Sequence, residues 1–166
     1  ILTGRKKDTI VLSNGENIEP SPLEDAILSK VRLVEQVMLT GQDGRKLVAI
    51  AVLNPSELAN AGYFDHNSVG DLQIAYDRVN DPKCSMEECD NACKILEGVS
   101  KTLRTNGELI KALEKEMKIA TSRFRKWEQV RDIYITLEPF AMANGLLTQS
   151  YKVKRDFVMK RYGDEI

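Results

Sequence analysis

Short apolar runs alternate along the chain with longer stretches whose apolar residues recur every three or four positions. The runs at 9–13, 34–40, 46–53 and 132–137 are rich in β-branched and apolar residues and predict strands. The run 47–53 is apolar without alternation, which is typical of a strand covered on both faces. We therefore expect this strand at the centre of a small sheet.

The periodic stretches predict helices around that sheet. Ser21-Pro22-Leu23-Glu24 and Ser85-Met86-Glu87-Glu88 have the pattern of helix starts, and Asn106 begins a third helix. The expected buried positions are Leu23, Ala26, Ile27 and Val31; Cys89, Ala92, Leu96, Val99 and Leu103; Ile110, Leu113, Met117, Ala120, Phe124 and Trp127; and Val153, Phe157, Val158 and Tyr162. The fold class is therefore α+β: a small mixed sheet with an N-terminal β-hairpin, packed with about four to five helices.

Turn residues separate these elements. Asn14-Gly15 and Asp43-Gly44 each lie between two strand-like runs and predict hairpin turns. The stretch 59–82 shows no clear periodicity, leans acidic and carries glycine and proline breakers. It predicts a surface excursion without regular structure.

Length and charge narrow the function classes. The chain has 166 residues, 30% of them charged, with a net charge of −1, which fits one domain with its own core. Balanced charge argues against a general nucleic-acid binder, and no apolar run reaches the roughly 18 residues of a membrane helix. The chain shows no signal peptide and opens at Ile1 rather than methionine, so we expect it to be part of a longer protein.

Three cysteines, Cys84, Cys89 and Cys93, fall within ten residues of one another. An odd number of clustered cysteines fits a reducing compartment better than a disulfide framework. Their spacing matches no zinc motif, and His66 is the single histidine that could join them. We interpret them as free thiols and predict no metal site.

The candidate chemistry lies near the far end of the chain. A flexible, small and polar run, 144–155, carries Lys152 where a basic amphipathic segment, 152–162, begins. A compact ammonium group suits negative charge that develops on phosphate or carboxylate oxygens. A surface lysine before a helix is usually only solvated, so this run by itself leaves both interpretations open.

Two motifs at opposite ends of the chain carry a family resemblance. The segment 3–18, followed by 19–27, and the segment 148–155 together resemble the small C-terminal domain of the adenylate-forming (AMP-binding) ligases, in particular the long-chain fatty acid branch. The resemblance implies a hinge motif at 1–8 and a single C-terminal lid domain at 9–166. It also implies an insertion at about 62–104 and a large N-terminal domain that is absent here.

The resemblance implies an enzyme with two half-reactions. Such ligases use ATP and Mg²⁺ to convert a fatty acid to an acyl-adenylate, and then form a thioester with CoA; acyl carrier protein is the alternative acceptor. The small domain swings between two poses, one for each half-reaction, so the isolated chain should show no turnover. The implied location is cytoplasmic, with peripheral membrane association through the absent part as an open alternative.

Five residues match functional positions of the family. Lys152 matches the lysine that contacts the carboxylate and the α-phosphate, and Arg5 matches an arginine near the nucleotide. Lys7 falls at the hinge. Gly15 and Glu16 match the loop that lines the phosphopantetheine channel in the thioester pose.

The chain departs from the wider superfamily beside Lys152. Tyr151 stands where glycine is common, and Gly145-Leu146-Leu147 replaces an earlier Pro-Lys pair. The long-chain branch often reads Gly-Leu-Leu-Thr-x-Ser/Thr-x-Lys, so this departure favours that branch.

Two other classes remain as alternatives. One is a non-catalytic interaction domain that kept the ligase fold. The other is a binding module that uses a basic patch for nucleic acid or membrane. The candidate patch residues are Arg123, Arg125, Lys126, Arg131, Lys152, Lys154 and Arg155. The balanced charge of the chain disfavours this second class, and we predict no nucleic-acid partner.

Overall fold

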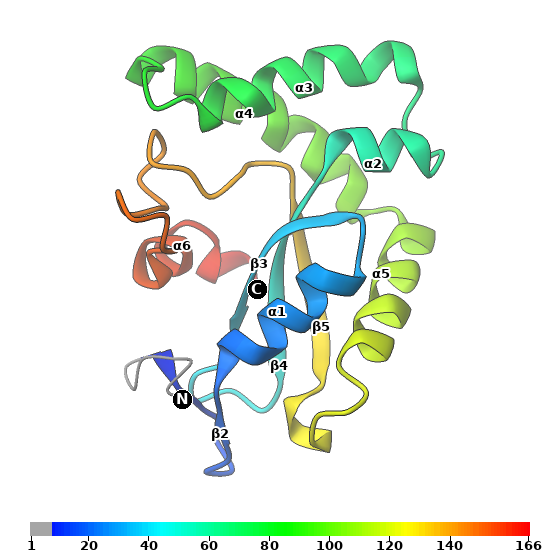
Figure 1. Ribbon diagram of the computed structural model, residues 1–166, viewed down its shortest axis with the longest axis vertical. Helices are drawn as coiled ribbons and strands as arrows, with labels where there is room; N and C mark the ends of the chain where they lie inside the picture. The colour runs from blue at the N-terminus through cyan, green and yellow to red at the C-terminus, as the bar shows by residue number, and fades with distance from the viewer. Residues whose placement is uncertain (1–7) are drawn as a thin grey trace. The chain divides into compact units, whose positions relative to one another are not determined.

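The computed structural model describes residues 8–166 of the chain (Figure 1). Two compact units make up the fold: the residues up to Ala51 with Asn106–Tyr134, and Val52–Thr105 with Ile135–Ile166. Helices and strands mix in the α+β arrangement that the sequence predicts. None of the helices within residues 8–166 is long and apolar enough to span a bilayer.

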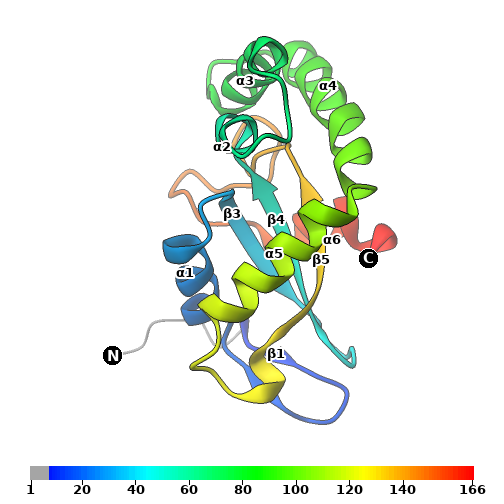
Figure 2. The same ribbon diagram turned by 90° about the vertical axis from the view of Figure 1, so that its right-hand side faces the viewer.

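The first unit contains the N-terminal hairpin and most of a three-stranded sheet. Strands β1 (Ile10–Val11) and β2 (Asn17–Ile18) pair antiparallel, with Ile10 opposite Ile18. Strands β3 (Val34–Thr40), β4 (Leu47–Leu53) and β5 (Val130–Thr136) form the sheet in that order. Helix α1 (Pro20–Lys30) packs against β3 and against α5 (Gly107–Ala120), and Figure 2 shows α5 lying across the strands.

The central strand is the one that the apolar pattern predicts. All seven residues of β4 are buried, and β4 lies between β3 and β5. The turn before it differs in detail from a simple Asp-Gly hairpin, because Asp43, with φ of 58°, takes the left-handed conformation and Gly44 does not. Aspartate tolerates this conformation because its short side chain can hydrogen-bond locally.

Helix α1 buries the predicted stripe of Leu23, Ala26 and Ile27, but its first residue is not the predicted one. It begins at Pro20 with Glu19 as N-cap, and no side chain caps it. Ser21 therefore lies inside the first turn instead of capping it. The fixed φ of Pro20 suits the first helical position, and the helix starts two residues earlier than predicted.

The second unit contains α2 (Pro55–Asn60), α3 (His66–Asn80), α4 (Met86–Arg104) and α6 (Arg155–Tyr162). Helix α3 contradicts the predicted surface excursion at 59–82. It buries Leu72, Ala75, Tyr76 and Val79, whose spacing of three and four residues is helical, and it packs beside α4. The acidic composition of the stretch 59–82 and the glycine at position 70 made this short apolar stripe hard to recognise in the sequence.

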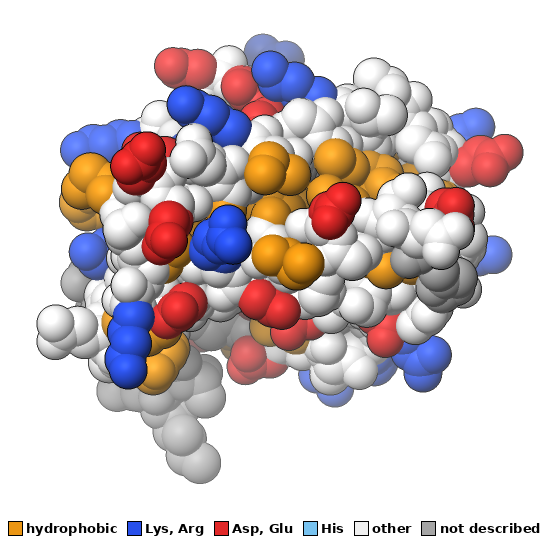
Figure 3. Space-filling view, turned by 90° about the horizontal axis from the view of Figure 1, so that it is seen from above, with side chains coloured by type: hydrophobic (Ala, Val, Ile, Leu, Met, Phe, Trp, Pro, Cys, Tyr) orange, Lys and Arg blue, Asp and Glu red, His pale blue; other side chains and the backbone are white. Residues whose placement is uncertain are grey.

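The surface over α3 and α4 also carries apolar side chains, which Figure 3 shows gathered in patches between charged groups. Ile74, Met86 and Ile95 are the large apolar residues of these helices that are exposed. Exposed apolar residues are ordinary on soluble proteins. We assign this surface no role.

Helix α4 begins with the predicted capping box: the Ser85 side chain accepts from Glu88 N–H, and the Glu88 side chain accepts from Ser85 N–H. Its buried face is rotated slightly from the predicted one. Val99 is half-buried, and Ser100 is fully buried in its place. A buried hydroxyl needs partners, and those of Ser100 lie in the same unit.

The predicted seam from Ile110 to Trp127 is shorter than expected. Helix α5 ends at Ala120, and it buries Leu109 while Ile110 is half-buried. The buried Thr121 hydroxyl donates to Met117 O and ends the helix there. Phe124 and Trp127 follow in a turn, with Trp127 in a 3-10 helix at Lys126–Glu128.

Strand β5 is buried on both faces at its end, whereas the alternation of Ile133, Ile135 and Leu137 with Tyr134 and Thr136 in the sequence predicts one buried face. Tyr134 and Thr136, expected on the open face, are as buried as Ile135 and Leu137. In the terminal helix, Phe157 is predicted to be buried but is exposed. Val158 and Tyr162 are buried, as predicted. Because Lys154 and Lys160 lie over the Phe157 ring, cation–π contacts accompany its exposure.

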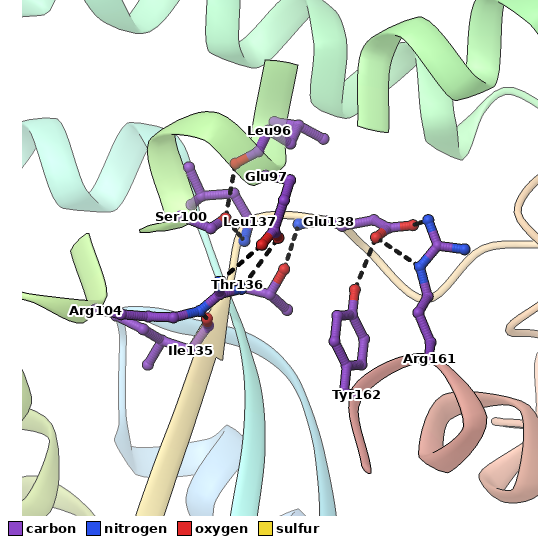
Figure 4. Close-up of polar contacts among 10 residues, drawn as sticks. All are labelled: Leu96, Glu97, Ser100, Arg104, Ile135, Thr136, Leu137, Glu138, Arg161 and Tyr162. Carbon is purple, nitrogen blue, oxygen red and sulfur yellow. Dashed lines mark hydrogen bonds and ion pairs between the residues drawn. The ribbon is translucent and has the colours of Figure 1, made fainter. Parts of the chain in front are cut away.

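We expect Ser100→Ala to lower the free energy of unfolding by about 2 kcal/mol. Ser100 Oγ donates to Leu96 O at 2.7 Å and accepts from Leu137 N at 2.8 Å (Figure 4). Alanine leaves the buried Leu137 N–H without an acceptor. Chemical denaturation measures the change, and Ser68→Ala on the exposed side of α3 is the control; equal effects of the two substitutions would contradict this role.

Candidate functional site

A buried carboxylate holds the start of the loop that carries Lys152. Glu138 lies two residues after the end of β5 and is 2% exposed. Its Oε2 accepts hydrogen bonds from Arg161 Nε at 2.9 Å and Tyr162 OH at 2.7 Å, and its Oε1 forms an ion pair with Arg161. Figure 4 shows Glu138 between these two side chains of α6. One side chain thus links the exit of the strand to the terminal helix.

The neighbours of Glu138 keep the protonation states that this cluster requires. Burial raises the pKa of the Tyr162 phenol, and the adjacent carboxylate raises it further, so the hydroxyl stays protonated as a donor. Burial opposes the charge on Arg161, but Glu138 outweighs it, and the pKa of the guanidinium is raised. Arg161 and Tyr162 therefore both stay protonated as donors to Glu138 across the physiological pH range.

Asn144 closes the loop over this anchor. Its Nδ2 donates to Glu138 Oε1 at 3.2 Å and to Pro139 O at 2.7 Å. Its Oδ1 accepts from Ala141 N at 3.1 Å and Leu146 N at 3.3 Å. The side chain of Asn144 replaces the hydrogen bonds that regular structure would supply to this segment.

Lys152 lies in a small hairpin beyond this closure. Leu147 and Val153 form an antiparallel bridge. Thr148 N donates to Lys152 O at 2.8 Å, and Lys152 N donates to Thr148 Oγ1 at 3.1 Å. The backbone of Lys152 is thus fixed, although composition predicts a flexible run, while its side chain is exposed and has no hydrogen bond or ion pair within residues 8–166.

Tyr151 occupies a strained position before Lys152. Its φ is 63°, in the left-handed region, and its side chain is 74% exposed. A bulky residue is disfavoured there, whereas glycine is not. This conformation gives a physical reason for the glycine that is common at this position in the superfamily.

The turn at Gly15 and Glu16 belongs to the first unit. Gly15 has φ of 87°, as the turn prediction requires, and a Cβ there would meet no heavy atom within 4 Å. Glycine is needed here for its backbone conformation rather than for space. Glu16 is half-buried, and its N–H donates to Asn14 Oδ1 at 3.0 Å.

The other two candidate residues, Arg5 and Lys7, lie outside the described residues. The structure describes the Lys152 hairpin and the Gly15 turn each within its own unit, and their functional roles stay predictions. Sequence reasoning missed Glu138, Asn144 and Arg161. A carboxylate directly after an apolar strand was the available signal, but its partner Arg161 lies 23 residues further on.

The cysteines are free thiols, as predicted. Cys89 and Cys93 are buried, and burial raises the pKa of both thiols, which keeps them protonated and unreactive at neutral pH. Cys84 is half-buried. Within the described part of the chain, no three His, Cys, Asp or Glu side chains gather as metal ligands.

Comparison with known proteins identifies the domain. Residues 7–80 match the family described as AMP-binding enzyme C-terminal domain. The chain contains an AMP-binding enzyme C-terminal domain. This confirms the resemblance carried by the N-terminal motif. The match ends within the segment 62–104, and the insertion there stays a prediction.

Similar proteins extend this result over the whole chain. The long-chain-fatty-acid–[acyl-carrier-protein] ligase AEE15 of Arabidopsis thaliana is 32% identical and covers 100% of this chain. The long-chain-fatty-acid–CoA ligase 5 of Rattus norvegicus is 29% identical and covers 99%. The chain spans 17% and 20% of these proteins, respectively.

A solved structure supports the fold. The A domain of carboxylic acid reductase from Segniliparus rugosus matches this AMP-binding C-terminal domain with a TM-score of 0.65 and 24% identity. The match covers 99% of this chain and 20% of that protein. The α+β architecture is therefore one that occurs within an adenylation domain.

We expect Glu138→Ala to lower the free energy of unfolding by about 3 kcal/mol, measured by urea denaturation. Tyr162 OH would lose its acceptor, and Arg161 would lose its counterion. Arg161 is 39% exposed, so water compensates part of its charge and keeps the loss moderate. Asp164→Ala, which removes an exposed carboxylate of the same unit, should change stability by less than about 0.5 kcal/mol; similar losses in both variants would argue against the anchor.

We expect Tyr151→Gly to stabilise the domain by about 1 kcal/mol relative to Tyr151→Ala. Both substitutions remove the exposed ring, but only glycine relieves the strain at positive φ. The comparison in thermal and chemical unfolding therefore isolates the backbone contribution. Equal stability of the two variants would show that the hairpin does not hold this conformation in solution.

Proposed function

We propose that this chain is the lid domain of a long-chain fatty acid ligase, which activates a fatty acid with ATP and then forms a thioester. The observation that carries the proposal is the free ammonium group of Lys152, held on a hydrogen-bonded hairpin beyond the Glu138 anchor. The matches to ligases for long-chain fatty acids support the substrate class.

Lys152 would act as a charge and as a donor. In the adenylate-forming pose, its ammonium group would lie between the fatty acid carboxylate and the α-phosphate of ATP, which repel one another. A fixed cation between two anions holds them in line and neutralises charge that grows in the transition state. No proton transfer by Lys152 is required.

Four other residues complete the proposal. Arg5 would bind nucleotide oxygens through its guanidinium group, and Lys7 would be the hinge between the two poses. The turn at Gly15 and Glu16 would border the thiol substrate in the second pose. Its exposed backbone and the open space above Gly15 suit the approach of an extended chain.

CoA is the proposed thiol acceptor, with acyl carrier protein as the second candidate. The relative from Arabidopsis thaliana, which is named as a carrier-protein ligase, has 32% identity to the chain, whereas the rat CoA ligase has 29%. The proposal includes Mg²⁺ with ATP but gives it no ligand among the described residues.

The domain organisation follows from the same proposal. Residues 1–8 would link a large N-terminal domain to the lid at 9–166. The segment 62–104, which contains α3 and α4, would be a lineage-specific insertion. A cytoplasmic location and peripheral membrane association are predictions for the longer protein.

We expect Lys152→Ala in the full-length ligase to slow adenylate formation by about two to three orders of magnitude. Thioester formation from supplied acyl-adenylate should stay near the unmodified rate, because the ammonium group serves the first half-reaction. Pyrophosphate release and thioester formation, measured separately, test this split.

Two variants control this experiment. Lys160→Ala removes an exposed lysine from α6 of the same unit and should leave both half-reactions unchanged. Lys7→Pro should have the opposite pattern from Lys152→Ala, because a rigid hinge impairs the thioester step. Equal loss of both half-reactions in Lys152→Ala would remove the proposed role.

A further inference from the structure

A second polar site lies in the first unit, apart from the Lys152 hairpin. A pocket of about 250 Å³ is lined by side chains from the N-terminal turn, the start of β4 and the segment after α5. Its lining residues are Leu12, Asn14, Arg45, Lys46, Leu47, Lys126, Trp127 and Arg131. The ligase proposal assigns none of them.

The pocket concentrates positive charge in a chain whose net charge is −1. Four of its lining residues are cationic and none is acidic. Lys46 forms an ion pair with Asp132. The side chains of Arg45, Lys126 and Arg131 have no hydrogen bond or ion pair within the described part of the chain, so three cationic groups border one small cavity without a counterion.

Trp127 also lines the pocket, but its unsatisfied indole N–H lies in the buried part of the side chain and is not accessible from the open cavity. Its Nε1 is buried and is the single buried side-chain nitrogen or oxygen among the described residues without a hydrogen-bond partner. Buried donors normally have an acceptor. Gln129 holds this turn in place, since its Nε2 donates to Thr121 O at 2.6 Å and its Oε1 accepts from Thr121 Oγ1 at 3.2 Å. The indole is thus a fixed feature of the turn.

We propose that this pocket binds a phosphate ester. A phosphate group offers several acceptor oxygens and up to two negative charges, which match the three unpaired cations that line the pocket. Asn14 lies at the same rim; its Oδ1 accepts from Glu16 N–H, and its amide group remains as a further donor. The proposed phosphate site does not depend on the proposed ligase function.

The size of the pocket sets what it admits. At about 250 Å³ it is smaller than the roughly 300–1,000 Å³ that hold a drug-sized ligand. It therefore takes the phosphate and the first atoms of the attached group, and the rest of the ligand lies outside. Both a soluble phosphate ester and the headgroup of a phospholipid present that chemistry.

The fluorescence of Trp127 reports on the pocket directly, because it is the only tryptophan in the 166-residue chain. We expect a saturable fluorescence change on titration with glycerol 3-phosphate and none with glycerol. Glycerol 3-phosphate has no base, acyl group or thiol, so the result does not depend on the ligase function. Vesicles of phosphatidylcholine, with and without phosphatidic acid, test the lipid source.

Substitutions assign the binding to the pocket. Arg131→Ala and Lys126→Ala should each weaken binding about tenfold or more, the usual effect of losing a charge-assisted hydrogen bond. Lys118→Ala removes an exposed lysine from α5 and should leave the affinity unchanged. Arg45→Ala removes a third lining cation and should also weaken binding, measured by calorimetry, with circular dichroism as the check on folding.

Each outcome decides the proposal. Binding to glycerol 3-phosphate or to phosphatidic acid vesicles that is lost in the pocket variants supports the phosphate site and identifies its source. Binding to neither phosphate probe overturns it. Equal weakening in Lys118→Ala and Arg131→Ala also overturns it, since the effect would then reflect net charge alone.

Discussion

The buried carboxylate of Glu138 is the interaction on which the second unit depends. An ionised carboxylate that is 2% exposed would be costly without partners, and this one has Arg161, Tyr162 and Asn144. Because these donors come from the loop and from α6, the carboxylate is satisfied only when β5, the loop and the helix are all in place. A single polar group thus couples three segments, each of which also buries apolar side chains.

This coupling matters for Lys152 because the lysine side chain is long and free. An ammonium group on four rotatable carbons is positioned only as well as its backbone. The hairpin hydrogen bonds fix that backbone locally, and the Glu138 cluster fixes the segments on both sides. The backbone of Lys152 is therefore held in place, whereas its side chain is free to move. The ammonium group can reach a substrate held by another domain, and less conformational entropy is lost on contact than with a mobile backbone.

Local patterns predicted those parts of the fold that local physics determines. The apolar run of β4, the capping box of Ser85 and the turn at Gly15 depend on neighbours within a few residues, and all three were predicted correctly. Glu138 and Arg161 could not be paired in this way, since only tertiary contact joins them. Ser100 and the two-sided burial of β5 were missed for the same reason: periodicity shows which face is apolar, but it does not show which polar group the fold will satisfy.

Two local costs remain that packing does not explain. Tyr151 holds a backbone conformation that glycine would adopt more easily, and Trp127 buries an N–H without an acceptor. Each lies beside cations without partners: Lys152 in one unit, and Lys126 and Arg131 in the other. Replacing either residue would increase the stability of a fold selected for stability alone. Positions that break a local structural rule in this way are expected at functional sites. An incoming anion would neutralise the unpaired cations at both places, so each local cost lies where the chain holds charge for a ligand, although the steric strain at Tyr151 and the buried N–H of Trp127 are not themselves relieved by that charge.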